Sequence, residues 1–400
     1  MASTYLQRTP TTRTNNQKFT FSCWFKKSAI ASAGYIAINY ESGNDRGYVV
    51  LDGNDKFNVY DVAGGTVRLN ILSNFVLRDT NAWYHLVYSV DSTAGSNRVK
   101  FYINGVDRYS DFTVTTAMSQ NSTVGFQQGT TSNGFKIGSQ EAGSTTFSGL
   151  MSHVNFVDGL QLDASSFGET DTTTGQWKIL TSPTVSEYGN NGFFILKNGN
   201  SVTDQSGKGN NLTVGAGTLT NTLDCPDNVF ATMNPLTSYY AGAWTFSNGN
   251  NTVNMGTTSE RYVVGTMGFS SGKWYWEQKY VSKSDSTFSR VGIESNINNT
   301  APDQSTSGYG YRGETSDASQ GMKVNNGTYT FWGDDYGVGD IIGCAVDMDN
   351  NKIYFSINGV WQESGDPTSG ATGTGSAFTI IDPPSGFYFP KIGKEDADTG

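Results

Sequence analysis

Short stretches in which large apolar residues alternate with small or polar ones recur along the whole chain. Residues 18–26 read Lys-Phe-Thr-Phe-Ser-Cys-Trp-Phe-Lys, with an apolar side chain at every second position from Phe19 to Phe25. A period of two residues places such side chains on one face of a β-strand. Comparable runs lie at 83–91, 97–106, 135–138, 147–157, 192–196, 261–264, 272–280, 290–294, 308–312, 328–332, 339–347 and 352–360. We therefore predict an all-β protein, with helix limited to single turns such as 163–167.

One strand pattern occurs twice. Residues 83–91 end in Val-Asp, and the next strand ends in Ile-Asn-Gly-Val at 103–106. Residues 339–347 also end in Val-Asp, and the strand that follows ends in Ile-Asn-Gly-Val at 357–360. Asn-Gly after alternating apolar residues is the strongest short signal for a hairpin, because a type I′ turn needs positive φ at both positions. The repetition predicts two antiparallel β-sandwich (jelly-roll) domains of related architecture in tandem.

The boundary between them is expected near 224–235, where two prolines and several Asn and Asp residues interrupt any ladder of hydrogen bonds. We therefore expect one domain at 1–228 and a second at 229–400. The net charge of −10 is unevenly divided. Residues 1–228 carry 16 basic and 18 acidic side chains, whereas 229–400 carry 10 and 18, so the acidity belongs to the second domain.

Composition agrees with this fold class and excludes several functions. The 48 glycines disfavour helices, while 21 Tyr, 23 Phe and 8 Trp supply strand residues. The acidic balance argues against nucleic-acid binding. The longest apolar runs, such as 341–346, are far shorter than a membrane span, so we expect no membrane insertion. The N-terminus lacks the apolar core of a signal peptide, and Cys23, Cys225 and Cys344 are too far apart for a disulfide framework.

Several of these motifs resemble known families. Residues 1 to about 225 resemble a laminin G-like domain of the concanavalin A-like sandwich superfamily, through segments 19–25, 83–87, 99–105, 147–154 and 204–210. Residues from about 235 onward resemble a SPRY domain, which is a bent β-sandwich, through 272–277, 291–293, 339–347, 353–359 and 387–390. A SPRY domain usually closes with a further strand after a segment such as Phe-Tyr-Phe-Pro at 387–390. Because the sequence ends at Gly400, we expect that strand to be missing, supplied by a longer chain, or replaced by a partner strand.

The tandem of these two domains is similar to structural proteins of tailed bacteriophages, especially marine ones. The resemblance implies a non-enzymatic protein that is made in the host cytoplasm and displayed on the virion surface as a fibre, spike or decoration. Its expected partners are other virion proteins of capsid or tail, host-surface glycans and further copies of the chain, although no heptads that would drive trimerisation are present. A purely structural decorating protein and a glycan-degrading enzyme are the alternatives.

No catalytic residues are expected. A glycosidase on such a sandwich needs two carboxylates that flank the bond, typically along one strand as Glu-x-Asp-x-x-Glu, and the sequence has no such run. Glu277 and Glu294 lie in separate strand patterns. His85 and His153 also lie inside apolar strand patterns, without a neighbouring nucleophile motif. We expect both histidines to be structural.

One loop is a candidate calcium site. Residues 204–211 read Asp-Gln-Ser-Gly-Lys-Gly-Asn-Asn, and oxygen ligands at a glycine-rich loop suit a hard cation. The candidate ligands are Asp204, Asn210 and Asn211, and calcium is the one cofactor that the sequence suggests. A purely structural loop is the competing interpretation, since the segment has a single carboxylate. Residues 347–351 begin like a calcium loop, but turn chemistry explains them.

A ligand surface is expected at one end of the second domain, in the segments 308–313 and 331–337. Aromatic faces there could stack on sugars while acidic side chains bond hydroxyl groups. The candidate residues are Tyr309, Tyr311, Trp332, Asp334, Asp335 and Tyr336. Core packing is the competing interpretation for each of them. In the first domain, 45–48 and 52–55 are loop candidates with no signal beyond turn chemistry.

Overall fold

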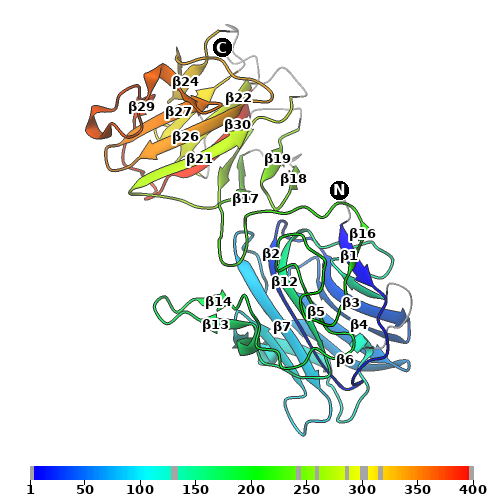
Figure 1. Ribbon diagram of the computed structural model, residues 1–400. Coiled ribbons are helices and arrows are strands. Elements are labelled where there is room, and N and C mark those ends of the chain that lie inside the picture. The colour runs from blue at the N-terminus through cyan, green and yellow to red at the C-terminus, as the bar shows by residue number, and fades with distance from the viewer. Residues whose placement is uncertain are drawn as a thin grey trace. The chain divides into compact units, whose positions relative to one another are not determined.

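The computed structural model describes residues 4–127, 134–239, 245–256, 261–283, 288–297, 305–313 and 319–395 (Figure 1). Throughout these residues the regular structure consists of β-strands and five short 3₁₀ turns, which confirms the all-β prediction. The turn expected at 163–167 is η3, Ala164–Ser166. No helix in the described ranges is long and apolar enough to cross a membrane. The chain divides into two compact units, Met1–Phe230 and Ala231–Gly400, whereas the sequence placed the division after Asn228.

Unit 1 is a sandwich of two antiparallel sheets. The eight-stranded sheet has the order β10 (Phe112–Thr116), β6 (Thr66–Ser73), β5 (Phe57–Ala63), β4 (Asp45–Leu51), β3 (Gly34–Ser42), β11 (Phe135–Ile137), β1 (Tyr5–Arg8) and β16 (Thr213–Ala216). The six-stranded sheet has the order β15 (Phe193–Ile195), β12 (Gly149–Asp158), β2 (Lys18–Lys27), β7 (Trp83–Asp91), β8 (Val99–Ile103) and β9 (Val106–Asp107). A separate hairpin joins β13 (Gly168–Thr170) to β14 (Trp177–Ile179). The remaining 3₁₀ turns of this unit are η1 (Tyr109–Asp111) and η2 (Gly125–Gln127).

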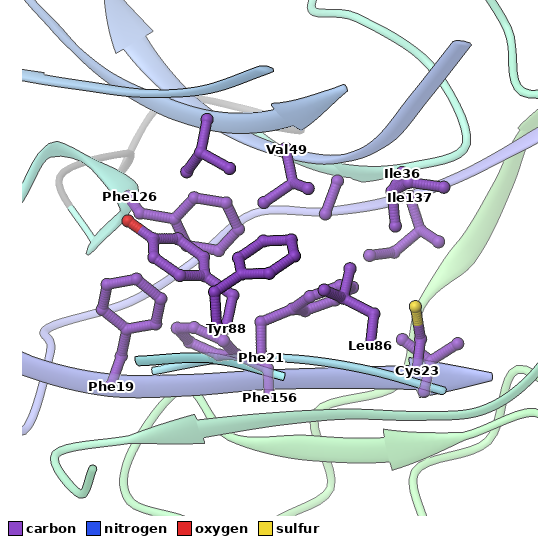
Figure 2. Close-up of a cluster of buried hydrophobic side chains, with 14 of the residues drawn as sticks. Phe19, Phe21, Cys23, Ile36, Val49, Leu86, Tyr88, Phe126, Ile137 and Phe156 are labelled. Carbon is purple, nitrogen blue, oxygen red and sulfur yellow. The ribbon is translucent and has the colours of Figure 1, made fainter. Parts of the chain in front are cut away.

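The core of unit 1 lies between the two sheets. The alternate residues of β2 that the sequence placed on one face, Phe19, Phe21, Cys23 and Phe25, are all fully buried in this core. Figure 2 shows several of them among side chains from β3, β4, β7, η2, β11 and β12. The aromatic rings pack edge-to-face or stacked, as between Phe19 and Phe126 at 5.0 Å. The period-two pattern is therefore satisfied by burial of one strand face.

The opposite face of the six-stranded sheet is also covered. Val87 of β7 packs there in a smaller cluster with Phe167 and Phe194. Trp24 of β2 packs in another cluster with Trp83 and Ile179. Trp177 of β14 packs there, and its indole N–H donates to His85 Nδ1 at 3.0 Å. Burial on both faces explains why β2 holds almost no exposed residue.

Unit 2 is a second sandwich. Its seven-stranded sheet has the order β17 (Met233–Tyr239), β20 (Arg261–Gly265), β30 (Phe389–Glu395), β22 (Phe288–Glu294), β23 (Gly308–Arg312), β24 (Met322–Asn325) and β25 (Thr328–Phe331). The five-stranded sheet has the order β21 (Lys273–Lys279), β26 (Ile341–Asp347), β27 (Lys352–Ile357) and β28 (Val360–Trp361), with β29 (Phe378–Thr379) also paired to β27. A small hairpin joins β18 (Thr245–Ser247) to β19 (Thr252–Asn254). The 3₁₀ turns η4 (Gln362–Ser364) and η5 (Gly370–Thr372) lie between β28 and β29.

The closing strand that the sequence suggested was missing from unit 2 is present. β30 begins within the Phe-Tyr-Phe-Pro segment and pairs with β20 on one side and β22 on the other. It is a central strand rather than an edge, so this position of the sheet needs no partner strand. The expectation rested on how few residues follow the Phe-Tyr-Phe-Pro segment, but β30 starts inside that segment at Phe389 and needs residues only as far as Glu395.

The repeated Asn-Gly pattern has the same structure in both units. Asn104 and Asn358 have φ of 49° and 50°, and the glycines that follow have φ of 80° and 82°, as a type I′ turn requires. The side chain of Asn104 accepts a hydrogen bond from the His85 N–H at 2.7 Å. Asn358 accepts one from the Ile341 N–H at 3.0 Å in the same way. Each asparagine thus ties its turn to the strand beside it, which confirms the predicted hairpin repeat.

Candidate functional site

Three residues of the predicted ligand surface in unit 2 are part of the core. Tyr309, Tyr311 and Tyr336 are 4%, 0% and 2% exposed. The Tyr336 hydroxyl donates to backbone carbonyls of Ser289 and Tyr311, and the Tyr311 hydroxyl donates to the Asp334 carbonyl. The prediction that these tyrosines form an exposed rim is wrong. Residues 309 and 311 lie on the same face of β23, and this face packs into the core of unit 2 rather than facing solvent.

The other three residues of that surface lie beside this core. Trp332 is half-buried and packs edge-on against Tyr311, with ring centroids 5.3 Å apart. The backbone N–H of Asp334 donates to Gln362 Oε1 at 2.7 Å, which fixes the loop. Asp334 is exposed and Asp335 is half-buried. The structure therefore brings Tyr311, Trp332, Asp334, Asp335 and Tyr336 together, whereas the Tyr309 ring packs against Phe378 and Tyr388. Among the described residues of this group, the tyrosine rings are buried and form no exposed aromatic face.

The candidate calcium residues also lie together, joined by hydrogen bonds. Asp204 Oδ1 accepts from the N–H groups of Phe194 and Ser206, and Oδ2 accepts from the Ser206 hydroxyl and the Asn210 N–H, at 2.8–2.9 Å. Asn211 Oδ1 accepts from the Asp204 N–H, and Asn210 Oδ1 accepts from Arg8. A carboxylate has about four lone-pair sites, so donors already fill those of Asp204. Calcium would have to displace these donors.

The two histidines have structural partners. His85 Nδ1 accepts from Trp177, so the ring proton lies on Nε2, which faces Ser22 Oγ at 2.9 Å. Burial lowers the pKa of His85 to about 3 and that of His153 to about 4. Both imidazoles are therefore neutral near pH 7. Within the described residues, no group of three or more His, Cys, Asp or Glu side chains could hold a metal ion.

Three tyrosines stand side by side on the outer face of the eight-stranded sheet of unit 1, and we call Tyr35, Tyr48 and Tyr60 the tyrosine face. They come from β3, β4 and β5 and point away from the core, because Val49 and Val59 between them point into it. The Tyr35 and Tyr48 rings are 5.3 Å apart and inclined at 64°, while Tyr48 and Tyr60 are 5.4 Å apart and stacked at 20°. The rings form one continuous half-buried surface.

The register of the sheet explains why Tyr48 and Tyr60 stack, whereas Tyr35 is opposite Val50 and meets Tyr48 diagonally. Tyr48 is directly opposite Tyr60, and Tyr60 is opposite Asn70 of β6. On the other side, Tyr48 is opposite Ile38, which is opposite Lys136 of β11. These residues make one row across five strands. An aromatic surface is thus flanked by an amide and an ammonium group.

Burial keeps the hydroxyls of Tyr35 and Tyr48 protonated, because it raises the pKa of both. Burial raises the pKa of Tyr48 to about 12, and burial followed by the charge of Glu141 raises the pKa of Tyr35. The Arg46 guanidinium lies 5.7 Å from the centre of the Tyr60 ring. Within the described part of the chain, the hydroxyls of the three tyrosines make no hydrogen bond. They are free to donate to a ligand.

Carboxylates do not line this face at its strand positions. The outward residues of β4, β5 and β6 are Arg46, Tyr48, Val50, Asn58, Tyr60, Val62, Arg68, Asn70 and Leu72. None of these described positions holds Asp or Glu, and Asp61 on β5 points inward to accept from the N–H groups of Gly125 and Phe126. These strand positions therefore offer rings, amides and cations rather than an acid pair, while the charge of Glu141 acts on Tyr35 and Tyr48 from outside them.

Sequence reasoning missed this site. Residues 45–48 were interpreted as a loop, whereas Arg46 and Tyr48 lie inside β4. Asp55, from the second loop candidate, is buried and pairs with Lys27. The usable signal was the alternation of Tyr48 and Val49, and of Val59 and Tyr60, which places aromatic residues on the face opposite to the valines.

The sheets of the two units define a protein of two tandem β-sandwich domains. Residues 2–165 match the family model of the concanavalin A-like lectin/glucanases superfamily, and residues 273–382 match that of the SPRY domain. Residues 2–165 of unit 1 are therefore similar to laminin G-like, concanavalin A-like domains, and residues 273–382 of unit 2 are similar to SPRY domains. A search of curated protein sequences gave no match.

Solved structures of both kinds are similar to parts of the chain. The SPRY domain of human HERC1 is 19% identical over 42% of this chain and 99% of its own, with a TM-score of 0.31. A putative carbohydrate binding protein from Bacteroides ovatus ATCC 8483 is 17% identical over 55% of this chain and 60% of its own, with a TM-score of 0.36. Domains LG4-5 of the mouse laminin alpha1 chain are 10% identical over 97% of this chain and 78% of their own, with a TM-score of 0.33.

Proposed function

We propose that this chain is a non-enzymatic surface protein that binds glycans through the tyrosine face of unit 1. The observation that carries the proposal is the set of three contacting, half-buried tyrosine rings with unpaired hydroxyls on the outer face of the eight-stranded sheet. Sugar rings present apolar C–H faces that stack on aromatic rings, and their hydroxyl groups bond to phenols and amides. The match of residues 2–165 to a superfamily that includes lectins supports this function.

The expected setting is the surface of a bacteriophage virion, where the chain would act as a fibre, spike or decoration and bind host-surface glycans. This setting is supported by the resemblance of the domain tandem alone. Weak contacts of single sites would be multiplied by many copies on one particle. The direct test is to locate the chain by antibody labelling on purified particles. Absence from such particles would remove the setting while leaving glycan binding open.

A glycan-degrading enzyme fits the tyrosine face less well, since the described outward positions of β4 to β6 offer no acid pair. A purely structural protein that binds other virion proteins is the second candidate. It is favoured by exposed Val106, Val114 and Val214 at strands of unit 1, which could contact a protein partner. The two candidates differ in whether the isolated protein binds sugars.

The experiment is a glycan array probed with the full chain and two variants. Tyr48→Ala removes the central ring of the tyrosine face, and Tyr102→Ala removes a tyrosine of the other sheet as a matched control. We expect wild type and Tyr102→Ala to bind the same glycans, and Tyr48→Ala to lose them. Tyr48→Phe keeps the ring, so it separates stacking from a folding defect and should retain part of the signal. Equal binding by wild type and Tyr48→Ala would place the sugar site elsewhere.

A further inference from the structure

A second group of aromatic and acidic side chains lies on the outer face of the five-stranded sheet of unit 2. It consists of Tyr275 and Glu277 from β21 and Trp361 from β28, with Gly343 and Ser356 between them. The register places Glu277, Gly343, Ser356 and Trp361 in one row across four strands. We call Tyr275, Glu277 and Trp361 the Tyr275 platform.

This face is open at the platform. The strand residues of opposite parity, such as Trp276 and Cys344, pack into the core of unit 2. Farther along the same outer face, Tyr354 is 1% exposed, and its hydroxyl meets Ser369 Oγ at 3.3 Å, so the segment after β28 covers that part. Tyr275, in contrast, is 54% exposed.

Glycine at position 343 allows the Tyr275 ring to lie along the sheet. A Cβ there would be 2.8 Å from the Tyr275 hydroxyl oxygen and 2.3 Å from Ser356 Oγ, so any side chain would displace the ring. The Tyr275 hydroxyl donates to Glu277 Oε1 at 2.6 Å, which fixes the orientation of both groups. Trp361 stands against the ring at 6.1 Å between centroids and an angle of 65°. The result is an exposed aromatic surface, bounded by a second aromatic ring and a carboxylate.

The donors and acceptors around this ring match a sugar. Trp361 Nε1 makes no hydrogen bond within the described residues, so it can donate, and Glu277 Oε2 can accept. A pyranose offers a C–H face for the ring, a hydroxyl donor for Glu277 and an oxygen acceptor for Trp361. A cationic group would give the Trp361 N–H no hydrogen-bond acceptor. It would also be repelled by the positive charge of Lys279, at the next outward position of β21.

We propose that the Tyr275 platform is a second, separate sugar site that binds a pyranose ring. The inference rests on the proposed glycan-binding function, but it concerns other residues and another unit. A chain with one site in each unit would hold a branched or repeating glycan by two points, which increases the effective affinity when the spacing allows it.

The test follows the indole N–H resonance of Trp361 in the full-length protein by ¹H–¹⁵N NMR. The probes are the methyl glycosides of glucose, galactose, mannose and N-acetylglucosamine, with choline as a cationic probe. Trp361→Phe identifies the resonance. We expect at least one glycoside to shift it in wild type and in Tyr48→Ala, and no shift in Tyr275→Ala. Tyr275→Phe keeps the ring and should respond, while Val360→Ala, at a 66% exposed neighbour, should behave as wild type.

Two outcomes would overturn the proposal. One is that no glycoside moves the Trp361 resonance, and the other is that choline moves it while the glycosides do not. A Trp361 shift that survives in Tyr48→Ala supports the Tyr275 platform even if the tyrosine face binds nothing. Loss of array binding in Tyr48→Ala supports the tyrosine face even if Trp361 never responds, so the two claims can fail separately.

Discussion

Lys26 and Asp224 form a buried ion pair across 198 residues of sequence, with 2.7 Å between Lys26 Nζ and Asp224 Oδ2. Lys26 belongs to β2, whereas Asp224 follows the last strand of unit 1. The Trp83 indole N–H donates to the other carboxylate oxygen at 2.9 Å. Both charged side chains are no more than 2% exposed, so each depends on the other for compensation of its lost hydration. The ion pair therefore holds the segment after β16 against the six-stranded sheet of unit 1.

Lys26→Met should destabilise unit 1 by ~3–5 kcal/mol, because it leaves the Asp224 carboxylate buried without a cation. Urea unfolding followed by tryptophan fluorescence measures the loss. In the double variant Lys26→Met/Asp224→Leu, both charges are gone, and we expect much of the stability to return. If Lys26→Met is as stable as wild type, water must reach the Asp224 carboxylate, and the account of the buried pair is wrong.

His85 should make the stability of unit 1 depend on pH. Its pKa is about 3 in the folded protein, through burial, and ~6.5 when unfolded. Between these values the unfolded chain binds a proton that the folded chain does not, so this contribution is complete above pH ~6.5 and is lost as pH falls toward 3. We therefore expect the stability difference between wild type and His85→Gln to shrink steadily from pH 6.5 to pH 4.

The comparison with a variant is needed because Asp61 acts in the opposite direction. Burial raises its pKa to about 7, so its contribution to stability is complete below pH ~3.9 and is lost as pH rises through 7. Asp61 is present in both proteins and therefore cancels in their difference. A difference that does not change with pH would mean that His85 is solvated or protonated in the folded state.

Asp204 should act as a structural anchor of its loop. Asp204→Ala leaves the buried N–H of Phe194 without its acceptor, and each such loss costs ~1–3 kcal/mol. We expect a lower melting temperature for this variant in EDTA as well as in calcium. A melting temperature of wild type that rises with calcium, and no longer does so in Asp204→Asn, would instead establish a calcium site at Asp204, Asn210 and Asn211.

Strand positions could be predicted because alternation is a local property of the sequence. Phe19, Phe21, Cys23 and Phe25 show it, and all four are buried on one face of β2. The Asn-Gly turns at Asn104 and Asn358 were equally local, since they follow from the φ values that these two residues tolerate.

The exposed face of each strand could not be predicted, because alternation separates two faces without saying which one meets another sheet. Tyr309 and Tyr311 of β23 point into the core. Tyr48 of β4 and Tyr60 of β5 point outward, although their strands have a similar pattern. The same ambiguity hid Glu294, which is buried beside Lys391 at 3.7 Å although it seemed to end a strand alone. Such pairings depend on how distant segments are brought together.

The central claim is that the tyrosine face, with its stacked rings of Tyr48 and Tyr60, binds glycans. Titration calorimetry with a glycan selected on the array, using wild type, Tyr48→Ala, Tyr60→Ala and the double variant, tests it most directly. We expect each single change to weaken binding about tenfold, equivalent to ~1.4 kcal/mol, and the double change to cost less than the sum. Unchanged affinity in the folded double variant would contradict glycan binding by the tyrosine face.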